Sequence, residues 1–269
     1  MNQDKLASIL RDLSPCLLAV SGGVDSLTLA VLAGRVLGED FAAVHAAGPA
    51  VPTEAGQRLR RVAQDEGLRL IVIDAGELDD VRYAANPANR CYYCKSRLFA
   101  AMRRQAEDFA QTAGRPVAVI SGTNRDDLSD FRPGLAAAAE HGVRHPYVEA
   151  DMGKDSVRAL ARELGLDFAS VPASPCLASR VYTGTKVTGE ILRAVDFAET
   201  FVKGATGLDV VRCRVRENEM RIETEEHATL PVGLIPRLDA ALRGQGHNFK
   251  NISLDPEGYK PGRAFIKTP

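Results

Sequence analysis

The residues from Ser21 to Ser26, Ser-Gly-Gly-Val-Asp-Ser, have the composition of a phosphate-binding turn. The run follows the apolar segment 16–20, which predicts a buried strand, and precedes segment 27–32, which predicts the start of a helix. A turn in this position aims backbone N–H groups at an anion, and glycine lets the main chain approach it closely. The serines can donate hydrogen bonds, and a carboxylate here could hold a magnesium ion. The candidate nucleotide ligands of this turn are Ser21, Gly22, Gly23, Val24, Asp25 and Ser26.

The turn lacks the lysine of the kinase-type phosphate loop. It resembles instead the SGGxDS pyrophosphate loop, or PP-loop, of ATP pyrophosphatases. That resemblance implies that ATP is cleaved between its α and β phosphates and that a substrate is adenylylated. An ordinary glycine-rich turn between a strand and a helix is the alternative. The Asp-Ser pair and the preceding strand favour the phosphate site.

The bulk composition indicates an ordinary globular protein of 269 residues, enough for one large domain or for a nucleotide domain and a smaller one. The 34 basic and 35 acidic residues nearly balance, so any anion site must be local and nucleic acid is not an expected partner. The sequence has no signal-peptide core in residues 1–14 and no apolar run of membrane-spanning length. We therefore expect a cytoplasmic protein without a membrane partner. In that compartment five cysteines favour metal binding or catalysis over a disulfide framework.

Short apolar runs alternate with helical patterns over the first two thirds of the chain, which predicts an α/β fold with a parallel sheet. Ligands bind such sheets at the carboxyl ends of the strands, where a second polar turn, 121–124, also falls. The predicted strands are 16–20, 41–45, 68–74 and 116–120, and the predicted helices are 53–66, 96–112 and 154–164.

The pattern changes after residue 172, and we expect a smaller α+β domain from there to the end of the chain. Two alternating segments, 209–216 and 220–224, predict paired strands. The predicted domains are 1–173 and 174–269. The other elements expected in the second domain are helices 188–202 and 234–242 and strand 251–254.

Three further motifs accompany the turn: Ser-Gly-Thr-Asn-Arg-Asp-Asp at 121–127, Ser-Pro-Cys-Leu-Ala-Ser-Arg at 174–180 and Leu-Asp-Pro-Glu-Gly-Tyr at 254–259. In this combination, and over nearly the whole chain, the sequence resembles the LarE family of ATP-dependent sulfur transferases. The resemblance implies an N-terminal PP-loop ATP pyrophosphatase domain, of the adenine nucleotide alpha hydrolase-like fold. It also implies a C-terminal domain that binds substrate and transfers sulfur.

The reaction implied by the resemblance uses ATP and magnesium. A carboxylate of a pyridinium-3,5-biscarboxylate mononucleotide is adenylylated, pyrophosphate leaves, and sulfur displaces AMP to give a thiocarboxylate. Two rounds give the precursor of the nickel-pincer nucleotide, the cofactor of lactate racemase. The implied partners are this small-molecule nucleotide, sulfide or another sulfur-donating system, and further copies of the chain in a homo-oligomer, a hexamer by resemblance.

Cysteines decide the source of the sulfur. Cys91 and Cys94 form a C-x-x-C pair, which alone fits a redox pair, half a zinc site or coincidence. With Cys176 they make three thiolates, which suit a 4Fe-4S cluster with one iron open, and the three-cysteine branch of the family implies that such a cluster passes on a sulfide. The alternatives are a sacrificial Cys176, which gives up its own sulfur, and zinc or a persulfide route. Cys16 and Cys213 are expected in the core.

For the other polar residues, packing, helix capping and surface charge are the alternatives to a functional role. Arginines that share a strand face suit anions, because a guanidinium binds a phosphate or carboxylate through two hydrogen bonds. The catalytic candidates are Cys176, Asp25 and Arg180. Further nucleotide-binding candidates are His45, Gly122, Thr123, Asp126 and Asp127, and the substrate-binding candidates are Ser179, Arg180, Arg212 and Arg214.

Two other functions remain open on the sequence. A tRNA thiolase can share the PP-loop and a three-cysteine cluster, but it needs a basic surface that this chain does not indicate. A non-catalytic iron–sulfur or nucleotide sensor would bind ATP without releasing pyrophosphate. Amidation of the GMP- or NAD-synthetase type is disfavoured, since ammonia transfer requires no cysteine trio.

Overall fold

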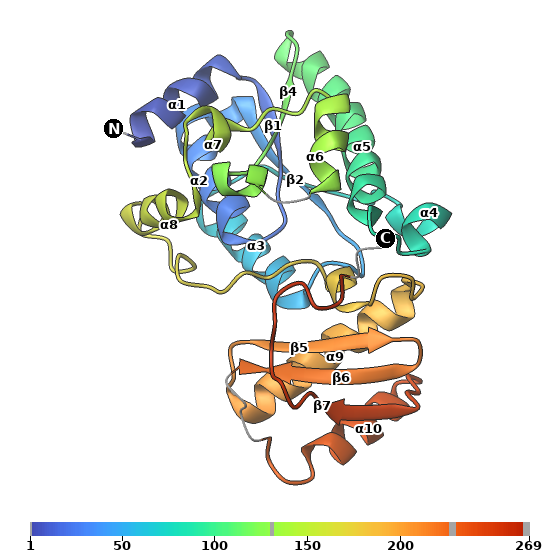
Figure 1. Cartoon of the computed structure of the whole chain (residues 1–269). Helices are drawn as coiled ribbons and strands as arrows, with labels where there is room; N and C mark the ends of the chain where they lie inside the picture. The colour runs from blue at the N-terminus through green and yellow to red at the C-terminus, as the bar shows by residue number, and fades with distance from the viewer. Residues whose placement is uncertain (1, 130–131, 226–229, 266–269) are drawn as a thin grey trace. The chain divides into compact units, whose positions relative to one another are not determined.

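The computed structural model describes residues 2–129, 132–225 and 230–265. The chain divides into two units (Figure 1). The N-terminal unit consists of Met1–Glu77 and Cys91–Ser174, and the C-terminal unit consists of Leu78–Arg90 and Pro175–Pro269. The α/β class expected from the sequence is confirmed.

The N-terminal unit contains a four-stranded sheet in the order β3-β2-β1-β4. Every pairing in it is parallel, as predicted, and Cys16 lies opposite both Phe41 and Ala118. The first strand along the chain thus lies between the second and the fourth. The chain passes from β1 to β2 on one side and reaches β4 on the other side, so the strand order reverses between β1 and β4. Parallel sheets bind ligands at the carboxyl ends of the strands at such a reversal. The strands are β1 (Cys16–Ala19), β2 (Phe41–Ala46), β3 (Leu70–Ile73) and β4 (Ala118–Ser121).

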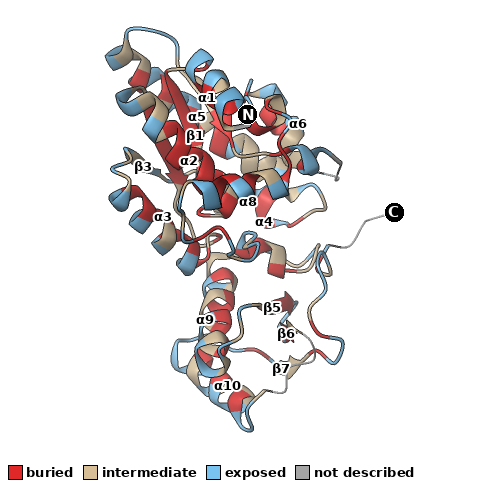
Figure 2. Ribbon diagram, turned by 90° about the vertical axis from the view of Figure 1, so that its left-hand side faces the viewer, coloured by how far each residue is buried: buried red, intermediate tan, exposed pale blue. Residues whose placement is uncertain are grey.

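Helices cover both faces of this sheet. Alternate residues of a strand point to opposite faces, so Leu18 packs with Leu27 of α2 and Leu160 of α8, whereas Leu17 packs with Phe99 and Met102 of α5. Buried residues gather along β1 and α2 (Figure 2). The helices are α1 (Asn2–Asp12), α2 (Val24–Leu37), α3 (Thr53–Asp65), α5 (Arg90–Ala113), α6 (Pro133–Glu140), α7 (Pro146–Glu149) and α8 (Lys154–Glu163).

Helix α5 begins at Arg90, six residues before the predicted start. The Ser96 hydroxyl donates to the carbonyl of Tyr92, one turn earlier, so this serine lies inside the helix and does not cap it. The C-x-x-C pair therefore lies at the start of α5. None of the helices in the described part of the chain is long and apolar enough to cross a membrane.

The C-terminal unit is built on a three-stranded sheet in the order β5-β6-β7. Strands β5 and β6 pair with each other, as predicted, and do so antiparallel, whereas β7 pairs parallel to β6. Thr188 caps the first turn of α9 through its side chain, and Gly207, with φ +72°, ends the helix in the left-handed conformation. The elements are α4 (Val81–Ala84), η4 (Leu177–Arg180), α9 (Gly189–Thr206), β5 (Val211–Arg216), β6 (Glu219–Thr224), α10 (Leu234–Gly244) and β7 (Asn251–Leu254).

The segment 78–90 is built into the C-terminal unit by Asn86, which no sequence pattern indicated. The Asn86 side chain is fully buried, and its amide nitrogen donates to the carbonyls of Tyr182 at 2.9 Å and Thr185 at 2.8 Å. Its amide oxygen accepts from Arg90, which also donates to the carbonyl of Ala178 at 3.0 Å. The residues directly before Cys91 are therefore fixed to the loop that follows Cys176.

We expect Asn86→Gly to lower the free energy of unfolding by about 2 kcal/mol, since it removes buried hydrogen bonds and leaves carbonyls unpaired. Glycine keeps the left-handed backbone of this position, whose φ is +56°, so the loss reports the side chain. Asn86→Ala adds about 1 kcal/mol of backbone strain. Urea unfolding measures both, and Asn248→Gly, outside this network, is the control. Unchanged stability of Asn86→Gly would contradict this account.

Candidate functional site

The PP-loop joins β1 to α2 in a conformation that requires glycine. Gly22 has φ +82°, and a Cβ there would lie 2.3 Å from the carbonyl oxygen of Ala55 in α3. Gly23 is the N-cap residue of α2, and no side chain makes a cap hydrogen bond there. The N–H groups of the first turn of α2 therefore keep their capacity to bind an anion.

The two serines of the loop hold it closed. The Ser26 hydroxyl donates to the carbonyl of Gly23 at 3.1 Å and accepts from the Ser21 N–H at 3.2 Å. The two hydroxyl oxygens are 3.3 Å apart. Both serines thus shape the turn, and Val24 follows as the first residue of the helix.

The loop after β4 lies against this turn. A Cβ on Gly122 would be 3.0 Å from the Cα of Ser26, so glycine is needed for this approach as well. The Asn124 side-chain amide donates to the Asp25 carboxylate at 3.1 Å. Thr123 reaches the Ser121 hydroxyl at 3.0 Å, and that hydroxyl lies 2.9 Å from Nδ1 of His145. The structure thus brings together the two polar turns that the sequence placed at strand ends.

Carboxylates gather beside the PP-loop. Burial raises the pKa of Asp25, and the nearby charge of Asp127 raises it further, while Asn124, Lys154 and Arg158 act in the opposite direction. Asp127 forms ion pairs with Arg132 at 2.9 Å and with Lys154 at 3.6 Å. Carboxylate oxygens suit Mg²⁺.

The magnesium ligands would not come from the protein alone. Among the described residues no three His, Cys, Asp or Glu side chains are grouped to hold a metal ion. Magnesium in proteins commonly takes one or two carboxylates together with phosphate oxygens and water. The carboxylates of Asp25 and Asp127 beside an uncapped helix start fit that coordination.

Two of the predicted nucleotide-binding residues, Asp126 and His45, form hydrogen bonds or close polar contacts within the protein. The Asp126 carboxylate accepts from the N–H of Lys154, the first residue of α8, at 2.8 Å. His45 is buried, and its Nδ1 lies 3.0 Å from the carbonyl of Val20. These contacts do not bear on nucleotide binding, so both residues stay predictions as nucleotide ligands.

Helices bring further residues to the loop that the sequence did not single out. The Tyr147 hydroxyl donates to the main-chain oxygen of Asp25 at 3.0 Å, and burial raises its pKa well above the ordinary value. Arg58 of α3 donates to the carbonyl of Gly22 at 2.7 Å. Neither Tyr147 nor Arg58 lies in one of the sequence motifs, whereas Asn124 lies in the motif at 121–127. The register of each helix against the sheet is not readable from the sequence.

In the C-terminal unit, Arg180 fixes the loop that carries Cys176. The guanidinium is buried and pairs with both carboxylate oxygens of Glu199, at 2.9 and 3.0 Å. It also donates to the Pro175 carbonyl at 2.7 Å and to the Ser179 hydroxyl at 3.0 Å. These contacts favour a positioning role for Arg180 and leave Cys176 exposed at the start of η4.

Arg212 and Arg214 lie on one face of β5, as predicted, and both are buried. Arg214 donates to Glu223 at 3.0 Å and to the carbonyl of Ser179 at 3.0 Å. The Tyr259 ring centroid lies 5.5 Å from the Arg212 guanidinium carbon and 5.9 Å from that of Arg214. Burial, and then the charge of Arg180, lowers the pKa of Arg212. The pair therefore belongs to a network with Ser179 and Arg180.

The cysteines separate into two sets by exposure. Cys91 and Cys176 are exposed and Cys94 is half-buried. The C-x-x-C pair belongs to the N-terminal unit, and Cys176 belongs to the C-terminal unit. Burial raises the pKa of Cys16 to about 12 and that of Cys213 well above its ordinary value, so both are packing residues, as expected. The accessible cysteines offer thiols, which are soft donors of the kind that iron–sulfur chemistry uses.

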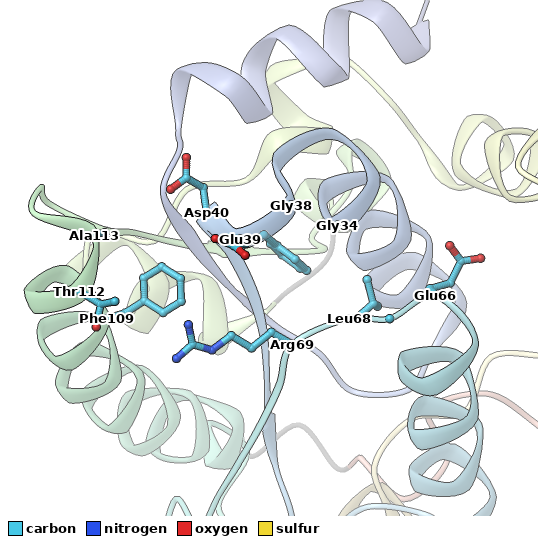
Figure 3. A pocket seen from close by; sticks show the side chains of 12 residues that line it. Gly34, Gly38, Glu39, Asp40, Glu66, Leu68, Arg69, Phe109, Thr112 and Ala113 are labelled. Atoms are coloured by element: carbon cyan, nitrogen blue, oxygen red, sulfur yellow. The ribbon is translucent and has the colours of Figure 1, made fainter.

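A cavity of about 570 Å³ lies away from the PP-loop, at the amino ends of β2 and β3 (Figure 3). Arg69 stacks over the ring of Phe109 there, 4.7 Å from its centroid. Glu66 in its wall is paired with Arg35 at 2.7 Å. Parallel sheets commonly bind ligands at the other edge, so the fold does not predict the nucleotide in this cavity.

Comparison with known proteins places the chain in a family. No family profile matches the chain. The chain is 36% identical over 97% of its length to an uncharacterized protein of Synechocystis sp., of which 95% is covered. It is 33% identical over 96% of its length to the pyridinium-3,5-bisthiocarboxylic acid mononucleotide synthase of Lactiplantibacillus plantarum, of which 91% is covered. It is also 27% identical over 59% of its length to a component of the glutamine-hydrolyzing GMP synthase of Methanocaldococcus jannaschii, of which 53% is covered, and this match fits the PP-loop fold. The chain belongs to the LarE family, that of the pyridinium-3,5-bisthiocarboxylic acid mononucleotide synthases.

Proposed function

We propose that this chain is an ATP-dependent sulfur transferase that makes a thiocarboxylate from a pyridinium-3,5-biscarboxylate mononucleotide. A carboxylate oxygen of that substrate attacks the α-phosphorus of ATP, and the bond to the β-phosphate oxygen breaks. Pyrophosphate leaves and an acyl-adenylate forms. Sulfide then attacks the carboxyl carbon, the bond to AMP breaks, and a thiocarboxylate results. A second round on the other carboxylate gives the bisthiocarboxylate named in the L. plantarum relative.

The observation that carries the proposal is the glycine turn at the start of α2, with the loop after β4 lying against it. Backbone N–H groups of an uncapped helix start favour the charge of pyrophosphate as it leaves. Asp25 and Asp127 would hold magnesium, which neutralises phosphate oxygens when bound. Asn124 orients the Asp25 carboxylate through its hydrogen bond at 3.1 Å.

The C-terminal unit would supply substrate recognition and the sulfur-bearing loop. Arg212 and Arg214 are proposed to bind the phosphate or carboxylates of the nucleotide substrate, as the family resemblance implies. The Ser179 hydroxyl accepts from Arg180 and its carbonyl accepts from Arg214, so one network links both candidate sites. Arg180 acts as a positioning residue for Cys176.

The proposed sulfur source is a 4Fe-4S cluster on Cys91, Cys94 and Cys176. When bound, such a cluster supplies an open iron that can hold a sulfide. The protein's own contribution is the accessibility of these thiols and the fixed backbone before Cys91 and after Cys176. Sacrifice of the Cys176 sulfur itself is the competing route.

Gly22→Ala should abolish ATP-dependent pyrophosphate release, because the added Cβ meets the Ala55 carbonyl oxygen at 2.3 Å. Gly38→Ala is a matched control at the other end of α2. Its φ of +56° is also positive, but no atom lies within 4 Å of the added Cβ. Release of AMP and pyrophosphate with the biscarboxylate substrate is the measurement. Equal activity of the two variants would contradict the role of the PP-loop in pyrophosphate release. Formation of ADP would contradict cleavage of ATP between its α and β phosphates.

Iron and sulfide should be present in anaerobically purified protein and should be lost in Cys91→Ser, Cys94→Ser and Cys176→Ser. Cys16→Ala, at a buried position, should keep both. Quantitation together with Mössbauer spectra distinguishes a 4Fe-4S cluster from zinc. An iron-free wild type would rule out the cluster. A mass loss of one hydrogen sulfide at Cys176 after turnover would then favour the sacrificial route.

Arg214→Lys should raise the KM for the nucleotide substrate about 10-fold or more, because lysine keeps the charge but loses the planar, two-donor geometry. The KM for ATP should stay unchanged, since ATP is bound by the other unit. Arg216→Lys, at the exposed end of the same strand, is the control. If the Arg214 and Arg216 variants have equal KM values, this strand does not bind the substrate.

A further inference from the structure

Arg58 makes the contact from which this inference starts. It lies on α3, is half-buried, and donates from Nη1 to the carbonyl of Gly22 at 2.7 Å. That is a short, charge-assisted hydrogen bond to the main chain of the PP-loop. The close packing of Gly22 on Ala55, one turn earlier in the same helix, keeps α3 in place for it.

The peptide bond between Gly22 and Gly23 has no side chain of its own to restrict its orientation. Glycine on both sides removes the steric barriers that side chains impose on backbone rotation. A trans peptide is planar, so its N–H points opposite to its carbonyl. With the carbonyl held toward α3 by Arg58, the N–H of Gly23 is turned away from α3. Its hydrogen bond to the Ser21 hydroxyl is long, at 3.4 Å, which leaves it able to take a stronger acceptor.

Other carbonyls of the loop are held by different means. The carbonyl of Gly23 accepts from the Ser26 hydroxyl at 3.1 Å and from the N–H of Leu27 at 3.0 Å. The carbonyl of Asp25 accepts from the Tyr147 hydroxyl at 3.0 Å. Each bond fixes one peptide plane from its carbonyl side, and the corresponding N–H groups are thereby aimed before any anion arrives. Such preorganised donors stabilise developing negative charge without reorganising.

We propose that Arg58 is a positioning residue of the pyrophosphate site, which holds the Gly22–Gly23 peptide so that the Gly23 N–H binds the leaving pyrophosphate. The inference rests on the proposed function. It adds to it a residue outside the motif, on a helix that no sequence pattern linked to the loop. Arg58 also adds a positive charge next to the loop, which favours the same anion.

Pyrophosphate binding to the full-length protein with Mg²⁺, measured by calorimetry, tests the proposal. Arg58→Ala should weaken it by about 10- to 100-fold, the range for a lost charge-assisted hydrogen bond. Arg58→Lys, which keeps a donor and the charge, should recover part of the loss. Arg60→Ala, exposed on the same helix, removes an equal charge without touching the loop and should bind like the wild type.

A second readout separates positioning from a merely structural role. In ATP–pyrophosphate exchange, Arg58→Ala should lower kcat while the KM for the carboxylate substrate stays unchanged, and its melting temperature should remain near that of Arg60→Ala. Wild-type affinity in Arg58→Ala, or an equal loss in Arg60→Ala, overturns the inference. So does a loss of affinity that follows melting temperature across all three variants. If the wild type itself binds neither pyrophosphate nor ATP, the proposed function fails instead.

Discussion

The close contact between the Gly22 backbone and α3 is the constraint on which the candidate nucleotide site depends. No Cβ fits between Gly22 and the Ala55 carbonyl oxygen, where only 2.3 Å would remain. On the other side Gly122 comes close to the first turn of α2, with a Cβ position 3.0 Å from the Cα of Ser26. The turn is therefore confined between α3 and the loop after β4. A confined turn has fixed N–H directions, and fixed N–H directions are what an anion site requires.

The sequence predicted the parts of the fold that rest on local pattern. Alternating apolar runs predicted the parallel sheet, and the glycine turn predicted a polar site at its edge. The predicted start of α5 at residue 96 was six residues late, since the helix begins at Arg90 and the Ser96 hydroxyl bonds back within it. Asn86 and Arg58 were also missed, since their partners lie far away in the chain. Long-range partners depend on how elements dock, and single-sequence periodicity carries no information about docking.

Buried ion pairs hold the cysteine loop of the C-terminal unit. The pairs of Arg180 with Glu199 and of Arg214 with Glu223 are both almost fully inaccessible to solvent. Such pairs contribute little net stability, because desolvation offsets their attraction, yet each partner is costly to remove alone. Their observable effect here is geometric. Arg180 binds the carbonyl of Pro175 and the hydroxyl of Ser179, and Arg214 binds the carbonyl of Ser179, so the backbone on both sides of Cys176 is fixed.

The two cysteines of this unit, Cys176 and Cys213, differ in their exposure to solvent. Cys213 lies on β5, and its N–H donates to Glu199 at 3.0 Å. Burial, followed by the charge of Glu199, raises the pKa of its thiol, so it stays protonated and is a poor nucleophile or ligand. The same Glu199 pairs with Arg180 and thereby fixes the loop that exposes Cys176. One carboxylate thus disfavours the thiolate of the buried cysteine and helps to present the other cysteine to solvent. Burial and charge together therefore leave Cys176, rather than Cys213, as the accessible thiol of this unit.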